Sequence, residues 1–263
     1  MAMSQIDMKH NKQTKLYITI LAGGVGKRMN SELPKVLHQV KGEAMIVRLL
    51  RQIIKFNPVK IIIVVGKFHQ IIKEEIDKNI PFDWPIVYAR QETPLGTGDA
   101  VKSTLPLFNS NETATNIILN GDVPLLQYST IHDIYASYLT KNSHFQITSI
   151  NLASPSGNGR IIRENGMFQE IVEEKDCNPE QKLITLINCG IYIFDIQVLL
   201  NYIPKIKNTN AQNEYYLTDI VKIYRDATQQ VIDLYILDVN KEIEIYNVNT
   251  RQQLEYLENL GTS

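Results

Sequence analysis

Two cations follow a glycine-rich turn near the start of the chain, a combination that can bind phosphate. Residues 16–22 form a short apolar run, as expected of a buried strand, and the run ends at Gly23-Gly24. Glycines at such a turn let backbone amides approach a phosphate, and Arg28 and Lys35 add positive charge. The turn is not a dinucleotide-binding fingerprint, because Met29 stands where a third glycine is needed, and it lacks the ending of a P-loop. The pattern therefore predicts an anion site.

Three other polar positions allow more than one interpretation. Asp122 lies in Gly-Asp-Val-Pro after an apolar run, which in roughly half of such cases is only a turn with a capping aspartate. Glu173 belongs to a run of charges that fits a solvated face. Asn188 lies between two apolar residues, and a buried amide needs hydrogen-bond partners, of which a sugar hydroxyl is one candidate. No Ser-His-Asp or Cys-His arrangement for nucleophilic catalysis can be read from the sequence.

The elements that must position these residues alternate along the chain. Apolar runs predict strands at residues 16–22, 59–65, 86–89, 116–119, 145–152, 187–194 and 231–237, and helical spacing predicts helices at 45–56, 69–78, 101–107, 130–140, 216–225 and 251–258. This alternation predicts an α/β fold with a Rossmann-like, mainly parallel mixed sheet and helices on both faces. Residues 160–163 and 168–173 flank an Asn-Gly turn, which predicts an inserted antiparallel lobe on the substrate side.

Composition limits the classes of function. The 27 basic and 28 acidic residues nearly balance, so no nucleic-acid surface is expected, and no apolar run is long enough to cross a membrane. Two cysteines fit free thiols in a reducing compartment, which favours a cytoplasmic protein. Residues 1–15 are polar and carry both signs of charge, so we expect a flexible N-terminal arm before one domain at 16–263.

A series of motifs resembles the sugar-phosphate nucleotidyltransferases, and most closely the uridyltransferase half of the bifunctional bacterial enzyme that makes UDP-N-acetylglucosamine. The matching blocks follow the family's order over about residues 16–260. They are Leu21 to Met29, Leu33-Pro34-Lys35, Gln91 with Leu95-Gly96-Thr97-Gly98, Asn120-Gly121-Asp122, Gly157-Asn158-Gly159-Arg160, Ile171-Val172-Glu173-Glu174, Ile187-Asn188-Cys189-Gly190 and Asn210 to Asp219.

The resemblance implies a reaction and a role for each matched residue. UTP and N-acetylglucosamine 1-phosphate would give UDP-N-acetylglucosamine and pyrophosphate, with Mg²⁺ as cofactor, on a fold of the nucleotide-diphospho-sugar transferase type. The nucleotide would lie in the half at 16–125 and the sugar in the half at 126–263. The implied residues are Leu21, Ala22, Gly23, Gly24, Gln91, Gly96 and Thr97 for the nucleotide, Gly159, Glu173 and Asn188 for the sugar, Asp122 and Asn249 for the metal, and Arg28 and Lys35 as catalytic cations.

Departures from the family pattern leave alternatives open. Asp99 stands where histidine often follows Gly-Thr-Gly, and Lys27 stands where threonine is usual, so base or sugar preference could differ. The hexapeptide repeats of the bifunctional enzyme are not found, so acetylation is not expected. We expect a monomer or a small homo-oligomer. The alternatives are an enzyme that uses glucose 1-phosphate with UTP or TTP, and a non-catalytic nucleotide-sugar sensor. The sensor is less favoured because it has no physical need for metal ligands and leaving-group cations together.

Overall fold

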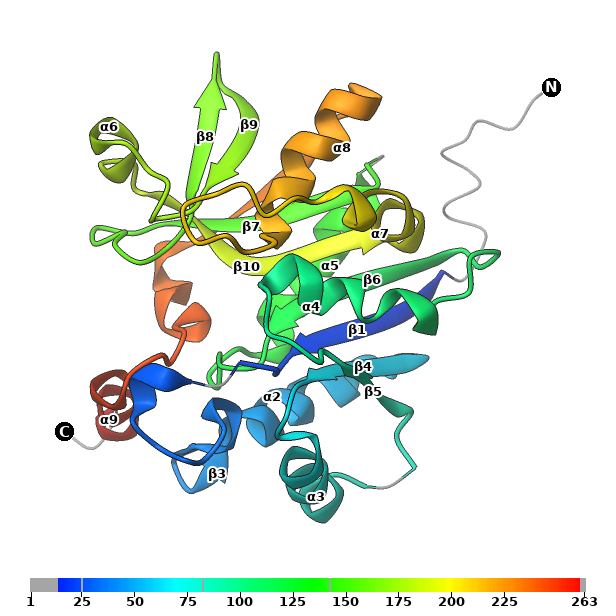
Figure 1. Ribbon diagram of the computed structural model, residues 1–263, viewed down its shortest axis with the longest axis vertical. Coiled ribbons are helices and arrows are strands. Elements are labelled where there is room, and N and C mark those ends of the chain that lie inside the picture. The colour runs from blue at the N-terminus through cyan, green and yellow to red at the C-terminus, as the bar shows by residue number, and fades with distance from the viewer. Residues whose placement is uncertain (1–13, 25, 82, 142, 261–263) are drawn as a thin grey trace.

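A mixed β-sheet forms the centre of the computed structural model, which describes residues 14–24, 26–81, 83–141 and 143–260 (Figure 1). Within these residues the main sheet has nine strands, and seven of them follow the order β11-β7-β10-β6-β1-β4-β5. The strands are β1 (Lys15–Leu21), β4 (Lys60–Val65), β5 (Ile86–Arg90), β6 (Ala114–Asn120), β7 (Phe145–Asn151), β8 (Arg160–Glu164), β9 (Met167–Val172), β10 (Leu186–Asp195) and β11 (Asp233–Leu237). On the seven-strand path, only β10 pairs antiparallel with its neighbours.

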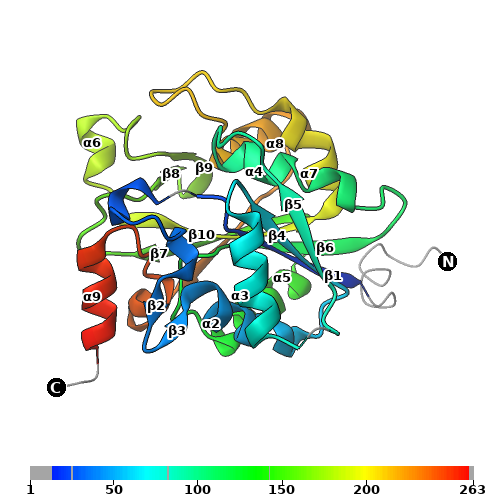
Figure 2. The same ribbon diagram turned by 60° about the horizontal axis from the view of Figure 1, so that its bottom comes forward.

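Helices cover both faces of this sheet, as Figure 2 shows. One face packs against α2 (Met45–Ile53), α3 (His69–Asn79) and α5 (Tyr128–Thr140). The other packs against α4 (Thr97–Lys102), α7 (Ile196–Tyr202) and α8 (Ile220–Thr228). Alternate residues of a strand point to opposite faces, so Ile61 and Ile63 join the first core while Ile62 joins the second. The predicted fold class is confirmed.

Several short elements complete the architecture. A small sheet pairs β2 (Gln39–Val40) with β3 (Glu43–Ala44), α6 spans Pro179–Lys182, and α9 spans Arg251–Asn259. The 3₁₀ helices are η1 (Lys27–Met29), η2 (Lys35–Leu37), η3 (Ile54–Phe56), η4 (Leu105–Leu107), η5 (Ile203–Lys205), η6 (Leu217–Asp219) and η7 (Val239–Ile245). None of the helices that the structure describes is long and apolar enough to cross a bilayer.

Some predicted boundaries are wrong. The helix predicted at 101–107 is two separate elements, α4 at Thr97–Lys102 and the 3₁₀ turn η4 at Leu105–Leu107. The α-helix does not extend through η4 because Pro106 has no N–H to donate to the preceding turn. Helix α7 was not predicted, because it begins directly after β10 and no turn residues separate the two elements. Most of the predicted N-terminal arm, residues 1–13, lies outside the described residues, and Lys15 already belongs to β1.

The topology brings the candidate residues to one edge of the sheet. Strands β1 and β6 are parallel neighbours, and Leu21 pairs with Asn120 at their carboxyl ends. From β1 the chain moves outward through β4 and β5 and then returns to β6 on the other side of β1. In open α/β sheets, a crevice forms at the carboxyl ends of the strands where the order reverses in this way. Both the glycine turn and Asp122 follow directly from these two strand ends.

The predicted hairpin is confirmed at β8 and β9. Asn165 and Gly166 have φ angles of 50° and 78°, the left-handed conformations that a two-residue turn of this kind requires. Within the described residues the hairpin pairs with the main sheet at one position, where Arg160 lies opposite Ile187 of β10. In Figure 1 it projects from the end of the sheet beside β7 and β10, so it forms the inserted lobe that the sequence predicts.

Candidate active site

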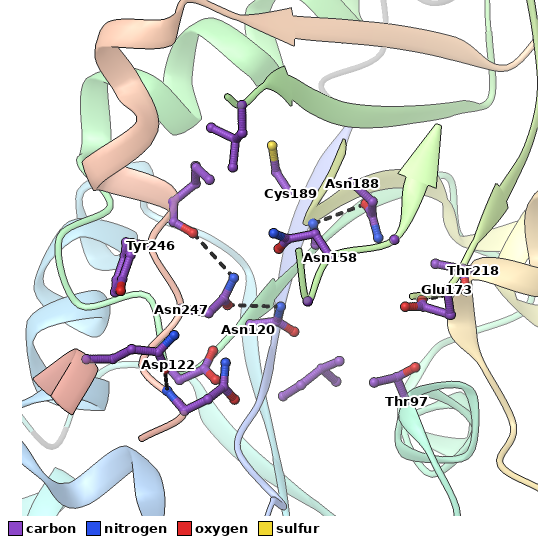
Figure 3. Close-up of a pocket in the computed structure, with 18 of the residues that line it drawn as sticks. Thr97, Asn120, Asp122, Asn158, Glu173, Asn188, Cys189, Thr218, Tyr246 and Asn247 are labelled. Atoms are coloured by element: carbon purple, nitrogen blue, oxygen red, sulfur yellow. Dashed lines mark hydrogen bonds between the residues drawn. The ribbon is translucent and has the colours of Figure 1, made fainter. Parts of the chain in front are cut away.

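A cavity of about 640 Å³ lies at the carboxyl ends of β1 and β6. Nine of the fourteen predicted site residues line it: Leu21, Arg28, Lys35, Thr97, Asp122, Gly159, Glu173, Asn188 and Asn249. Figure 3 shows Asp122 and Glu173 on opposite sides of the cavity, with Asn120 between them. The site therefore has two ends of different chemistry.

Cations and oxygen donors meet at the end that contains Asp122. The Lys35 ammonium forms an ion pair with the Asp122 carboxylate and donates a hydrogen bond to Asn249 Oδ1 at 3.0 Å. Arg28 Nη2 donates to the same Asn249 oxygen at 3.1 Å. Lys35 and Asp122 are largely buried, with 17% and 10% of their side chains exposed, whereas Arg28 is exposed. Three separate chain segments thus supply one charged cluster.

Packing around the glycine turn explains why these segments meet. Gly26 has a φ of +66°, and a Cβ atom there would lie 2.8 Å from Lys35 Cβ, so only glycine lets the turn fold against this lysine. Met29 is buried in a small core cluster with Val248 and Leu257. This cluster holds the turn that carries Arg28 against the C-terminal segment.

Two backbone contacts fix Asn249 in the cluster. The Val248 amide donates to the Asp122 carbonyl at 3.0 Å, and the Asn249 amide donates to Gln253 Oε1 at 2.7 Å. Gln253 also takes part in the capping box with Thr250 that begins α9. The cap of α9 therefore fixes the position of Asn249, the predicted metal ligand.

The donor set at Asp122 suits a hard divalent cation. Asp122 Oδ1 is buried and has no hydrogen-bond partner in the part of the chain that the structure describes, while Oδ2 and Asn249 Oδ1 both contact the Lys35 ammonium. No group of three or more His, Cys, Asp or Glu that could hold a metal occurs among the described residues. Magnesium commonly uses one or two protein ligands and completes its shell with water and substrate phosphates. The residues present therefore fit a magnesium ion that binds with a phosphate ligand.

Polar groups at the opposite end are arranged around a bulge in β10. The pairing of β10 with β7 shifts register between Asn188 and Tyr192, and such bulges often aim a side chain into a site. Asn188 Nδ2 donates to Tyr192 OH at 2.6 Å, and Asn188 Oδ1 accepts from the Gly190 amide at 3.1 Å. The partners that a half-buried Asn188 needs thus come partly from the chain itself.

Gly159 brings the backbone close to two other cavity groups. A Cβ atom at Gly159 would lie 2.9 Å from Ile171 Cγ2 and 3.4 Å from Glu173 Oε2, so a side chain would displace its neighbours. The Gly159 carbonyl accepts from the backbone N–H of Asn188 at 2.9 Å. The three predicted sugar residues therefore form one connected surface.

Glu173 lies among other acids at this end. Burial raises the pKa of the Glu173 carboxyl. A hydrogen bond from Thr218 Oγ1 to Glu173 Oε1, 2.9 Å long, lowers this pKa but by less than burial raises it. Burial, together with the charges of Asp176 and Glu170, raises the pKa of Asp219 from 3.8 to about 6. The Asp219 carboxyl is therefore only partly ionised in mildly acidic solution.

Replacing Asp219 should change how stability depends on pH. Because its folded-state pKa is raised, the folded protein holds this proton more tightly than the unfolded chain does, so the stabilising contribution is complete below about pH 4 and is lost as pH rises through about 6. We expect Asp219→Asn to gain about 1 kcal/mol of unfolding free energy relative to the parent between pH 4 and pH 7, less than full linkage because the carboxyl is only half-buried. Urea unfolding at both pH values measures this difference. An equal difference at both would contradict the assignment.

The other five predicted residues lie beside the cavity rather than on its wall. Gln91 Nε2 donates to the Gly96 carbonyl at 3.0 Å, and a Cβ at Gly23 would lie 3.2 Å from Gln91 Oε1, so these three are neighbours. Ala22 is buried, and its amide donates to the Val64 carbonyl. Gly24 has open space around it. The side chain of Lys27, which departs from the family pattern, lies outside those that the structure describes.

Sequence reasoning assigned no role to several polar residues of the cavity wall. They include Asn120, Asn158, Tyr192, Tyr246 and Asn247. Asn120 Nδ2 donates to Asn247 Oδ1 at 3.5 Å, which links the end of β6 to the segment before α9. The position of Asn120, directly before Gly121-Asp122 in a matched block, was a usable signal. No comparable signal pointed to Asn247.

Comparisons with known proteins agree with this geometry. The model of the family described as nucleotidyl transferase matches residues 18–239. A protein of Acanthamoeba polyphaga mimivirus, "Probable UDP-N-acetylglucosamine pyrophosphorylase", is 58% identical over 254 residues, which cover 96% of this chain and 99% of the relative. The "Bifunctional protein GlmU" of Clostridium botulinum (strain 657 / Type Ba4) is 38% identical over 241 residues, 91% of this chain and 50% of the relative. This chain thus spans about half the length of that bifunctional relative.

A solved structure shows the same fold. It is that of UDP-glucose pyrophosphorylase complexed with UDP-glucose, which matches with a TM-score of 0.71 and 17% identity over 94% of this chain and 98% of the other. The family match covers most of the chain, and this chain is similar to one relative along nearly its whole length and to another along half of that relative's length. These findings confirm the resemblance read from the sequence. The chain belongs to the nucleotidyl transferase family.

Proposed function

We propose that this protein transfers the uridylyl group of UTP to N-acetylglucosamine 1-phosphate, giving UDP-N-acetylglucosamine and pyrophosphate. The observation that carries the proposal is the two-ended cavity: Lys35 and Asp122 at one end suit a metal-bound triphosphate, and Asn188 at the other suits a sugar. The 58% identical relative, which this chain matches along nearly its whole length, is described as a probable UDP-N-acetylglucosamine pyrophosphorylase, and this supports the same substrates.

The chemistry that fits this site is a direct displacement at phosphorus. An oxygen of the sugar phosphate forms a bond to the α-phosphorus of UTP, the bond from that phosphorus to the α,β-bridging oxygen breaks, and pyrophosphate leaves with the electron pair. A phosphate dianion is already a competent nucleophile at neutral pH, so no side chain has to become one. The protein's task is positioning and charge neutralisation.

Lys35 and Arg28 would neutralise the triphosphate as charge moves toward pyrophosphate. Lys35 is largely buried and held by Asp122 and Asn249, so its ammonium is already oriented when the substrate binds. Arg28 is exposed at the mouth and adds a second cation. Asp122 and Asn249 would hold Mg²⁺, which when bound supplies further positive charge to the phosphate oxygens.

The two halves of the chain would divide the substrates between them. The half at 16–125 supplies the turn and the Gln91–Gly96 pair beside the cavity, which we assign to the nucleotide. The half at 126–263 supplies Glu173 and Asn188, which we assign to the sugar. Half-buried polar groups of this kind select a ligand that pairs with them, because a mismatched ligand leaves them unpaired.

A substrate matrix tests this function. The purified protein is mixed with Mg²⁺, with UTP, TTP, CTP, ATP or GTP, and with either N-acetylglucosamine 1-phosphate or glucose 1-phosphate, and pyrophosphate release is measured. We expect the highest kcat/KM for UTP with N-acetylglucosamine 1-phosphate. Equal rates for both sugars would favour the glucose-type alternative, and no release in any mixture would favour a sensor.

Asn188→Ala should weaken selection of the sugar. It removes an amide whose contacts hold the polar wall, so we expect kcat/KM for N-acetylglucosamine 1-phosphate to fall by about 10-fold or more, mainly through KM, while KM for UTP changes little. Asn151→Ala, at an exposed position of β7, serves as the control. A fall in kcat with unchanged KM for the sugar would contradict the assignment of Asn188 to sugar binding.

A further inference from the structure

We propose that Asp99 is a positioning residue that fixes the amide of Gln91 with its oxygen toward the base, so that the site selects uracil over cytosine. This inference rests on the proposed function, because it takes the nucleotide to lie beside Gln91. It concerns Asp99, which directly follows Gly96-Thr97-Gly98 and is one of the departures from the resemblance described above.

The two hydrogens of the Gln91 amide are both engaged by acceptors. Gln91 Nε2 donates to Asp99 Oδ2 at 2.8 Å and to the Gly96 carbonyl at 3.0 Å. An ionised carboxylate and a carbonyl can only accept hydrogen bonds. Rotating the amide by half a turn would place its oxygen against both acceptors, so the pair allows one orientation.

The amide oxygen consequently faces the glycine turn. A Cβ atom built on Gly23 would lie 3.2 Å from Gln91 Oε1, which places this oxygen beside the start of the turn. Gln91 is 7% exposed, and no hydrogen bond to its Oε1 occurs within the described ranges of the chain. The group presented at this point is therefore an acceptor on a largely buried side chain, and it can still take a hydrogen bond.

Hydrogen-bond chemistry then distinguishes the two pyrimidines. Uracil carries a hydrogen on N3 and can donate it to an acceptor, whereas N3 of cytosine has a lone pair and would meet Gln91 Oε1 acceptor against acceptor. A buried polar group left without a partner disfavours the wrong ligand strongly. If the amide could turn over, its NH₂ group would donate a hydrogen bond to N3 of cytosine, so selection depends on what holds the amide.

The backbone that carries Asp99 is itself held in place. Asp99 lies in α4, where the Gly98 amide donates to the Tyr215 carbonyl at 2.7 Å, and the Tyr215 amide donates to the Leu95 carbonyl at 2.8 Å. The carboxylate therefore has a defined position relative to Gln91. A histidine at this place could donate a hydrogen bond, so it would not impose the same orientation.

Binding and turnover of UTP and CTP test the proposal. For the parent protein we expect UTP to be preferred over CTP by at least about 100-fold in affinity, measured by calorimetry with Mg²⁺, and in kcat/KM. Asp99→Ala should reduce this ratio by about 10-fold or more, with weaker UTP and stronger CTP binding. Asp99→Asn keeps the size of the side chain and should shift the ratio in the same direction by a smaller factor. Asp77→Ala, in an exposed ion pair on α3, is the control and should leave the ratio unchanged.

The outcomes separate this inference from the proposed function. If the parent neither binds UTP nor transfers its uridylyl group, the proposed function fails. If the parent is active and both Asp99 variants lose affinity for UTP and CTP by the same factor, or keep the parent ratio, Asp99 does not orient Gln91 and the inference is wrong. Unchanged thermal unfolding of Asp99→Asn ensures that a changed ratio reports recognition rather than loss of the fold.

Discussion

Asp122→Asn is expected to lower kcat by about 1,000-fold, the largest effect of any substitution at this site, because several kcal/mol of charge stabilisation depend on the carboxylate and each 1.4 kcal/mol is tenfold in rate. The change keeps the size of the side chain but removes its negative charge. This side chain is only 10% exposed and forms an ion pair with Lys35. Asn249, the second oxygen donor, would then stand beside a neutral amide. Initial rates at increasing Mg²⁺ concentrations measure the effect.

The fold should survive this substitution. Asp122 Oδ1 has no hydrogen-bond partner within the described residues, so an amide at this position breaks only the ion pair to Lys35. Asp226→Asn, in an exposed ion pair on α8, is the control and should keep parent activity. Near-normal kcat of Asp122→Asn at saturating Mg²⁺ would contradict a metal role for Asp122.

Lys35→Ala is expected to lower kcat by about 100-fold or more, the scale on which enzymes lose rate when one preorganised charge-stabilising group is removed. Its ammonium lies between the two proposed metal ligands, which is where charge would grow as pyrophosphate leaves. An interaction that strengthens during the reaction lowers kcat when it is removed, whereas one equally strong before and during the reaction raises KM alone. Steady-state kinetics with varied UTP separate the two.

The resemblance implies the same catalytic role for Arg28 and Lys35, and the structure gives a reason to expect a smaller effect from Arg28→Ala than from Lys35→Ala. Arg28 is exposed, and within the described residues its side chain hydrogen-bonds to Asn249 alone, whereas Lys35 is largely buried and contacts both Asp122 and Asn249. Lys35→Arg should rescue poorly, because a planar guanidinium cannot replace a compact ammonium between two fixed oxygens. If both alanine variants kept the parent kcat and changed only KM for UTP, the turn would be a binding cradle without a catalytic role.

The sequence was sufficient to predict the fold because its signals are local. Apolar runs such as the one in β4 and helical spacing such as that of α2 follow from residues close together in the chain. Elements that lack a local signal were missed: α7 continues from β10 without a break, and β2 and β3 have two residues each. Their positions depend on packing, which one sequence does not display.

The site could be predicted only as far as matched motifs reach. The resemblance to the family assigned Asp122 and Asn249 to one metal ion, but it did not indicate that Lys35 forms the ion pair with this aspartate. The link from Asn188 to Tyr192 depends on a shift in strand register, and the link from Gln91 to Asp99 depends on how one amide is turned. Such details are set by three-dimensional packing and by the direction of each donor, so they appear only in the structure.

Following labelled phosphorus tests the central claim most directly. The protein is incubated with Mg²⁺, N-acetylglucosamine 1-phosphate and UTP labelled with ³²P at either the α- or the γ-phosphorus, and the products are separated. Uridylyl transfer predicts that the α label appears in UDP-N-acetylglucosamine and the γ label in pyrophosphate, in equal amounts and only when the sugar phosphate is present. Appearance of the γ label as orthophosphate, or retention of both labels in UTP, would contradict the function proposed for this protein.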